Sequence, residues 1–315
     1  MADYTDVDPE HPPHALGTVL RWAVLDRLTG KRRPKPAGPP APWTPTPKLR
    51  VARPTPAQVV WLGHASFLVQ LGGVNVLIDP LLGPVLGTYR RYQKPGLTVD
   101  QLPPIDVLLI THGHRDHLDL WTVRRLDLTT AVVTPSGLGD FFRRLGFTDV
   151  HELDWWRSVG RAGLRFTLAP ARHWSRRGLT DLNASLWGSY VIEGDGPTIY
   201  HGGDSAYWRG FREIGERFPE IDCALLPIGA YDPAWFMEHA HMNPEQAGQA
   251  FLDLGARRFV PMHYGTYRLT DEPLIEPVER LRSWWRREQP QGHLADLPVG
   301  GILELDAEAT PPRRA

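Results

Sequence analysis

Residues 106–119 read Asp-Val-Leu-Leu-Ile-Thr-His-Gly-His-Arg-Asp-His-Leu-Asp, and the rest of the chain is organised around this stretch. The apolar run from Val107 to Ile110 predicts a buried strand that ends at Thr111. Four candidate metal ligands lie in the six residues that follow: His112, His114, Asp116 and His117. Imidazole and carboxylate groups suit zinc, iron or manganese, and such a cluster directly after a buried strand is rare by chance. The stretch therefore predicts a metal site at the end of a strand.

The spacing of these ligands indicates how they divide between ions. His112 and His114 lie two residues apart, so an extended backbone points both side chains the same way. Asp116 and His117 follow a break that can turn them toward a second ion. The alternative is a solvated polar loop that is rich in histidine by coincidence.

All four positions resemble the dinuclear signature of the metallo-β-lactamase superfamily. The resemblance implies an α/β fold, namely an αββα sandwich with a dinuclear metal site at one edge. It also implies the remaining ligands, each of which follows a predicted strand. The implied sets are His112, His114 and His173 for the first ion, Asp116, His117 and His263 for the second, and Asp204 as a bridge. Two divalent ions are expected, with zinc first and manganese or iron as alternatives.

Two further residues are expected beside these ligands. Asp79 ends the predicted strand 74–78, and the resemblance implies that it orients the metal-binding loop. The alternative for Asp79 is a turn aspartate before Pro80. His64 falls between two predicted strands and is either near the metals or substrate, or a structural histidine.

Other segments of the chain carry a closer resemblance. They are Trp61-Leu62-Gly63-His64-Ala65-Ser66, Leu186-Trp187-Gly188-Ser189, Ile228-Gly229-Ala230-Tyr231 and His263-Tyr264-Gly265-Thr266. These segments are similar to the N-acylphosphatidylethanolamine-hydrolysing phospholipase D branch, of which the chain would be a bacterial member. The resemblance places His241 near the substrate, where it protonates a leaving group or binds phosphate. Three residues are expected either to line an apolar access groove or to belong to the core: Tyr231, Trp235 and Phe236.

The expected function is that of a metal-dependent hydrolase. The resemblance implies a phosphodiesterase that cleaves an N-acylphosphatidylethanolamine-like phospholipid with a metal-bridging hydroxide, which Asp116 orients as well as ligating a metal. The alternative is a dinuclear hydrolase of a small soluble ester, lactone or phosphodiester. A third hypothesis is a non-catalytic binding protein that keeps the fold, and the intact ligand set argues against it.

Composition limits the partners and the compartment. The 315 residues carry 35 basic and 36 acidic side chains, so no overall positive field favours nucleic acid. The single cysteine, Cys223, lies in an apolar run and allows no internal disulfide, which fits a reducing, cytoplasmic location. A small molecule or a lipid is the expected partner, and a homodimer is left open.

Residues 1–57 differ from the hydrolase domain expected over residues 58–306. They contain twelve of the 31 prolines and a short helix candidate over residues 15–28. This helix is expected to dock onto the domain, or else to contact the inner face of a membrane with help from Lys31, Arg32 and Arg33. Residues 307–315 are expected to form a disordered tail.

Overall fold

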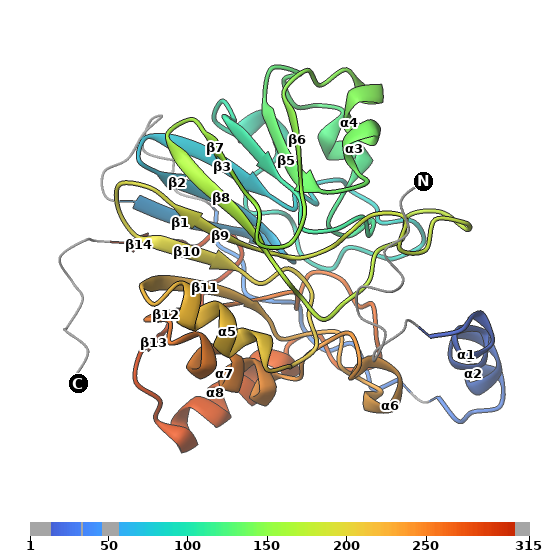
Figure 1. The fold of residues 1–315 in the computed structure, drawn as a ribbon. Coiled ribbons are helices and arrows are strands. Elements are labelled where there is room, and N and C mark those ends of the chain that lie inside the picture. The colour runs from blue at the N-terminus through green and yellow to red at the C-terminus, as the bar shows by residue number, and fades with distance from the viewer. Residues whose placement is uncertain (1–13, 33, 46–56, 306–315) are drawn as a thin grey trace.

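The computed structural model describes residues 14–32, 34–45 and 57–305. Two seven-stranded mixed sheets pack face to face, and helices cover their outer faces, as Figure 1 shows. The predicted αββα sandwich is confirmed. The predicted tail, residues 307–315, lies outside the described residues.

The first sheet has the strand order β14-β1-β2-β3-β4-β5-β6. Its strands are β1 Ala57–Gly63, β2 Ser66–Leu71, β3 Val74–Ile78, β4 Val107–Leu109, β5 Ala131–Pro135, β6 Val150–Leu153 and β14 Ile302–Leu305. Strands β1 to β3 form an antiparallel meander, whereas β3 to β6 run parallel to one another. The carboxyl ends of β3 and β4 therefore meet at one edge, where the metal-ligand motif begins.

The second sheet has the order β13-β12-β11-β10-β9-β8-β7. Its strands are β7 Ser158–Arg161, β8 Leu164–Ala169, β9 Ser189–Glu193, β10 Thr198–His201, β11 Ile221–Pro227, β12 Arg258–Met262 and β13 His293–Leu294. Because β10, β11 and β12 are parallel, the residues after β10 and β12 emerge at the same edge. This topology brings together Asp204 and His263, which lie 59 positions apart in the numbering.

The helices complete the outer layers. They are α3 Leu120–Val123, α4 Gly139–Leu145, α5 Gly210–Arg217, α6 Ala234–Met237, α7 Pro244–Leu254 and α8 Glu276–Glu288, with a 3-10 turn, η3, at Val99–Gln101. Figure 1 shows α3 and α4 beside β5 and β6, and α5, α7 and α8 against the second sheet. Asn243 caps α7 by accepting a hydrogen bond from Gln246 N, and the Gln246 side chain accepts one from Asn243 N.

The main core fills the space between the sheets. On β1 and β2 the side chains alternate, so that Trp61 and Phe67 point into this core while Leu62 and Leu68 pack on the outer face of the first sheet. Both faces of these strands are buried, which explains their nearly continuous apolar sequence. Cys223 is a free, buried thiol in β11.

The N-terminal segment is helical over three successive stretches, α1 Leu16–Leu20, the π-helical η2 Arg21–Leu25 and α2 Asp26–Leu28. The Trp22 ring stacks on Phe236 with ring centroids 4.5 Å apart, and the Arg32 guanidinium lies 2.6 Å from the Asp271 carboxylate. Residues 34–45 then run along the domain, where Ala41 N donates a hydrogen bond to Gly265 O. The face of the helix that carries Trp22 therefore packs onto the domain. In the described part of the chain, no helix is long and apolar enough to span a membrane.

Candidate metal centre

A first group of three imidazoles forms at the edge where β4 ends. The Nε2 atom of His112 lies 2.8 Å from Nδ1 of His114, and Nε2 of His173 lies 3.2 Å from the same Nδ1 atom. Ligands held at about 2.0–2.1 Å from one zinc ion stand roughly 3–3.5 Å apart. These three nitrogen atoms therefore converge as the resemblance predicts for the first ion.

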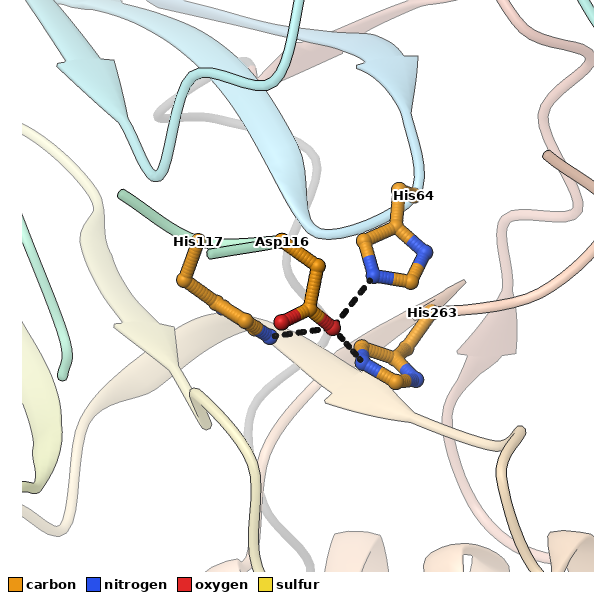
Figure 2. A group of neighbouring side chains, drawn as sticks. All are labelled: His64, Asp116, His117 and His263. Carbon is orange, nitrogen blue, oxygen red and sulfur yellow. Dashed lines mark hydrogen bonds and ion pairs between the residues drawn. The ribbon is translucent and has the colours of Figure 1, made fainter. Parts of the chain in front are cut away.

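A second group lies beside the first and contains Asp116, His117, His263 and His64 (Figure 2). The Asp116 Oδ2 atom lies 3.6 Å from His263 Nε2 and 3.8 Å from His117 Nε2. His64 Nε2 lies 3.2 Å from the same oxygen atom. His64 is thus in direct contact with a predicted ligand.

Asp204 lies between the two groups. Its Oδ2 atom is 3.2 Å from His117 Nε2, 3.2 Å from His263 Nε2 and 3.8 Å from His173 Nε2. The first two of these residues belong to the second group and the third belongs to the first group. A single carboxylate therefore faces both sets of ligands, which is the geometry expected of a bridge between two cations.

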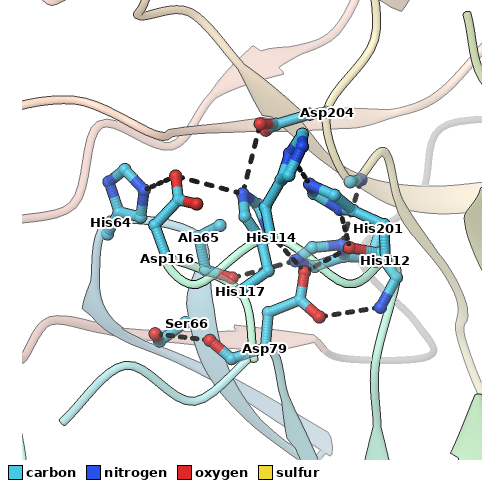
Figure 3. Close-up of polar contacts among 12 residues, drawn as sticks. His64, Ala65, Ser66, Asp79, His112, His114, Asp116, His117, His201 and Asp204 are labelled. Atoms are coloured by element: carbon cyan, nitrogen blue, oxygen red, sulfur yellow. Dashed lines mark hydrogen bonds and ion pairs between the residues drawn. The ribbon is translucent and has the colours of Figure 1, made fainter. Parts of the chain in front are cut away.

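Asp79 contacts the metal-ligand motif and fixes its position (Figure 3). Its Oδ1 atom accepts a hydrogen bond from Thr111 N at 2.8 Å, and its Oδ2 atom accepts one from Thr111 Oγ1 at 2.6 Å. The same Oδ2 atom lies 2.7 Å from His117 Nδ1. A protonated Nδ1 leaves the Nε2 atom of His117 available as a ligand, so Asp79 both orients this ring and selects its tautomer.

Other outer nitrogen atoms of the cluster have acceptors of the same kind. Thr111 Oγ1 donates to Asp79 and can accept from His112 Nδ1 at 3.0 Å. His173 Nδ1 lies 3.0 Å from the carbonyl oxygen of Ala240. Both contacts point the Nε2 atoms inward. His201, by contrast, uses its Nε2 atom in a structural contact with the carbonyl oxygen of Ala65, in the turn before β2.

The backbone is strained at this edge. His64, Asp79 and His263 have φ angles of 53°, 42° and 64°, in the left-handed region that residues other than glycine rarely adopt. Each such residue costs on the order of 1–3 kcal/mol, and such strain clusters at functional sites. This backbone strain lowers the stability of the fold, so its role at these three residues is to place their side chains.

The electrostatics divide the histidines into two classes. Burial lowers the pKa of His114 to about 4 and holds the pKa of His112 and of His173 well below the usual value. Burial acts the same way on His263, but the Asp204 and Asp116 carboxylates outweigh it and raise the His263 pKa to about 9. The His117 pKa is also raised well above its usual value, because Asp204, Asp79 and Asp116 outweigh its burial. Positive charge is thus strongly favoured within the second group.

Several buried atoms of the site lack hydrogen bonds within the described part of the chain. They include His117 Nε2, His263 Nε2 and Asp204 Oδ1. Unsatisfied buried polar atoms are costly, and native proteins keep few of them without a functional reason. The nitrogen and oxygen donors, their convergence and the field that favours positive charge all fit divalent cations.

The residues predicted to contact substrate are placed differently from one another. His241 Nδ1 lies 3.9 Å from Asp204 Oδ2, and its ring centroid lies 5.1 Å from that of His173. Tyr231 donates a hydrogen bond to Glu276 and lines the same pocket as His241. In α6, Trp235 is 48% exposed and Phe236 is buried beneath Trp22 and His14.

Two residues that brace the motif are absent from the sequence-based predictions. Arg177 Nη1 donates hydrogen bonds to the carbonyl oxygens of Gly113 at 3.0 Å and Leu118 at 2.7 Å. Ser175 Oγ accepts a hydrogen bond from Gly113 N at 3.1 Å. Nothing in the local sequence links these residues to the motif some 60 positions earlier, so only the fold identifies them.

Gly203 allows Asp204 to approach the motif, because its φ angle is 56° and an added Cβ atom would lie 2.7 Å from Gly188 O and 3.1 Å from Thr111 Cβ. We expect Gly203→Ala to lower the free energy of unfolding of the metal-free protein by about 2–3 kcal/mol. Gly163→Ala is the control, because Gly163 also has a positive φ but no atom within 4 Å of an added Cβ. Urea unfolding measures both, and equal losses would show that the close approach at Gly203 is unimportant.

Comparisons with known proteins agree with this geometry. The family model described as "Beta-lactamase superfamily domain" matches residues 74–264. An uncharacterised protein of Mycobacterium tuberculosis is 37% identical over 256 residues, covering 77% of this chain and 67% of that protein. N-acyl-phosphatidylethanolamine-hydrolyzing phospholipase D 1 of Caenorhabditis elegans is 34% identical over 247 residues, covering 71% of this chain and 68% of that protein. Among solved structures, the metallo hydrolase Igni18 from Ignicoccus hospitalis superposes with a TM-score of 0.61 at 23% identity, covering 79% of this chain and 98% of that one, and it supports the fold alone.

Proposed function

We propose that this chain, which belongs to the metallo-β-lactamase superfamily and is a metal-dependent hydrolase, is a dinuclear phosphodiesterase acting on a phospholipid related to N-acylphosphatidylethanolamine. The observation that carries the proposal is the pair of adjoining ligand groups with Asp204 between them. The phosphodiester class is supported by the name of the Caenorhabditis elegans relative.

In this proposal the first ion is held by His112, His114 and His173, the second by Asp116, His117 and His263, and both by Asp204. Zinc is the metal proposed, given the predominance of imidazole ligands. When bound, two such cations supply Lewis acidity and a water molecule of lowered pKa. His64 lies against Asp116 and keeps its carboxylate in place.

The reaction adds one water molecule across a P–O bond. The water oxygen joins phosphorus, the bond from phosphorus to the alcohol oxygen breaks, and the alcohol leaves with a proton. The Asp116 carboxylate accepts a hydrogen bond that orients the attacking water. Burial lowers the pKa of His241 to about 4, so its imidazole is neutral near pH 7. We assign this neutral ring to a hydrogen bond with the phosphoryl or the departing oxygen.

We also propose peripheral contact with a membrane through the N-terminal helix. Leu25 is 56% exposed and Leu28 is 80% exposed, on a helix whose Trp22 faces the domain. Arg27 and Lys31 are also exposed and would favour anionic lipid headgroups. The exposed leucines have no role in the packing of the domain, which is why a lipid surface is the partner proposed.

The test compares vesicles containing N-acylphosphatidylethanolamine and phosphatidylethanolamine with the soluble substrate bis(p-nitrophenyl) phosphate, with metal content measured on the same sample. We expect two ions per chain and the release of phosphatidic acid. The double variant Leu25→Glu/Leu28→Glu should lower vesicle turnover several-fold, because it removes apolar contact with the lipid. Turnover of carboxylic esters or lactones without any phosphodiester cleavage would favour the small-substrate alternative instead.

A further inference from the structure

The stretch between β11 and α7 connects the metal centre to the N-terminal helix. It contains α6 and a turn that ends at His241, and we call residues 234–241 the α6 segment. His241 Nδ1 lies 3.9 Å from Asp204 Oδ2, and the carbonyl oxygen of Ala240 lies 3.0 Å from Nδ1 of His173. The imidazole proposed to contact substrate and the acceptor that orients a predicted metal ligand are therefore neighbours on this segment.

The α6 segment is folded by its own backbone hydrogen bonds. Glu238 N donates to Ala234 O, and the N–H groups of Ala240 and His241 both donate to Met237 O. The described strands of both sheets lie outside residues 234–241. The position of the segment relative to the metal centre therefore depends on side-chain contacts.

The N-terminal segment makes several of these contacts, and Figure 1 shows α6 beside α1 and α2. The Trp22 ring stacks on Phe236 with centroids 4.5 Å apart and planes 13° apart. The His14 ring stacks on Phe236 with centroids 4.3 Å apart, and His14 Nε2 lies 2.7 Å from the Phe236 carbonyl oxygen. Both the ring and the backbone of Phe236 are thus held from the N-terminal side.

Trp22 is itself anchored to the domain. The Arg32 guanidinium lies over the Trp22 ring, 3.9 Å from its centroid, and pairs with Asp271 at 2.6 Å. Asp271 N in turn donates a hydrogen bond to the carbonyl oxygen of Asp232, two residues before α6. The Arg32 and Asp271 side chains are 13% and 8% exposed, so salt screens this pair only weakly. The Trp22 ring is therefore a fixed surface against which Phe236 packs.

We propose that the N-terminal helix positions the reaction site by holding the α6 segment against the metal centre. Trp22, through Phe236, is then a positioning residue for the Ala240 carbonyl oxygen and the His241 imidazole, and it touches neither of them. The proposed membrane contact uses the exposed leucines of the same helix, so the two roles lie on different faces. The effect on turnover rests on the proposed phosphodiesterase activity.

The first test uses bis(p-nitrophenyl) phosphate, a soluble diester whose turnover does not depend on contact with lipid. We expect Trp22→Ala, in the metal-loaded full chain, to lower kcat at least about tenfold with little change in KM, because a displacement of about 1 Å can cost about a hundredfold in rate. Trp22→Phe keeps an aromatic ring on Phe236 and should retain most of the original kcat. Trp22 lies outside the core between the sheets, so both variants should fold.

The second measurement needs neither metal nor substrate. In the metal-free protein, nitrogen-detected NMR reports which nitrogen atom of His173 carries the proton, and the Ala240 carbonyl oxygen favours a proton on Nδ1. We expect Trp22→Ala to shift His173 toward the other tautomer, because Ala240 is then no longer held in place. Trp22→Phe should leave the tautomer unchanged.

Trp285→Ala is the matched control for the loss of a half-buried tryptophan. Trp285 packs against Phe259 at the start of β12, whereas His263 follows the other end of that strand. This variant should leave both kcat and the His173 tautomer unchanged.

Unchanged kcat and an unchanged His173 tautomer in Trp22→Ala would overturn the inference. Equal losses in Trp285→Ala would also overturn it, since they would show an effect of stability alone. A lower kcat with an unchanged tautomer would overturn the coupling through Ala240. If the protein with two ions bound cleaves no phosphodiester, the proposed function fails, and the His173 tautomer in the metal-free variants still decides this inference.

Discussion

Asp204→Ala is expected to abolish turnover and to reduce the bound metal to one ion or none. Asp204 Oδ2 faces His117, His263 and His173 at 3.2, 3.2 and 3.8 Å, so its loss removes a ligand from both sets. It also removes the negative charge that offsets part of the mutual repulsion of two cations. We expect the affinity for at least one ion to fall by more than about a hundredfold, since even residues behind the ligands cost 10–100-fold when they are removed. Metal analysis and turnover measure the two effects.

The variant should remain folded, because Asp204 lies at the sheet edge and the core between the sheets is unchanged. Asp195→Ala is the matched control, since Asp195 is an exposed aspartate in the turn before β10. His112→Ala removes a ligand of the first group and should also abolish turnover. Full activity with two bound ions in either site variant would contradict the ligand assignment.

Asp79→Ala is expected to weaken metal binding by about 10–100-fold without removing any ligand. Asp79 accepts hydrogen bonds from Thr111 N and Thr111 Oγ1 and contacts His117 Nδ1, so the variant frees both the loop and the ring. The His117 side chain can then adopt the other tautomer or turn away from the ion. Competition with a chromogenic chelator measures the affinity.

A loss of general stability could imitate this result, and two further measurements separate the causes. The control Asp106→Asn changes a carboxylate that accepts a hydrogen bond from Asn75 N, near the opposite ends of β3 and β4. It should leave metal affinity unchanged. Nitrogen-detected NMR of the imidazole rings in the metal-free protein should show a changed His117 tautomer in Asp79→Ala only. Unchanged affinity and tautomer would mean that Asp79 is a turn residue, the alternative that its position before Pro80 left open.

The sequence was most informative where chemistry and local structure coincide. The motif after β4 contains four candidate ligands, and each remaining candidate follows a strand whose apolar pattern is visible in the chain. The resemblance implied that these candidates converge, and the structure supplies the reason: β10, β11 and β12 are parallel, so residues after their carboxyl ends share an edge. The αββα fold was predicted correctly on the same basis together with the resemblance.

The surroundings of the residues predicted to contact substrate could be predicted less well from the sequence. Tyr231, Trp235 and Phe236 lie within six residues of one another and are all aromatic, but the structure gives them three different surroundings. Phe236 is covered by Trp22 of the N-terminal helix, a contact between residues more than 200 positions apart. Sequence alone carries no periodicity that links two such segments. The boundary at residue 57 and the substrate roles of these three side chains stay predictions.

The sequence by itself determined the kinds of ligand, their order and the edge of the sandwich at which they gather. Residue type and position directly after an apolar strand are local features, and the resemblance implied the shared edge. Only the tertiary structure decided how each ligand is held, through the contacts of Asp79 with His117, His64 with Asp116, and His173 with the Ala240 carbonyl oxygen. Such pairings are set by how the two sheets and the connecting loops pack together, and packing between distant segments leaves no signature in the spacing of residues along the chain.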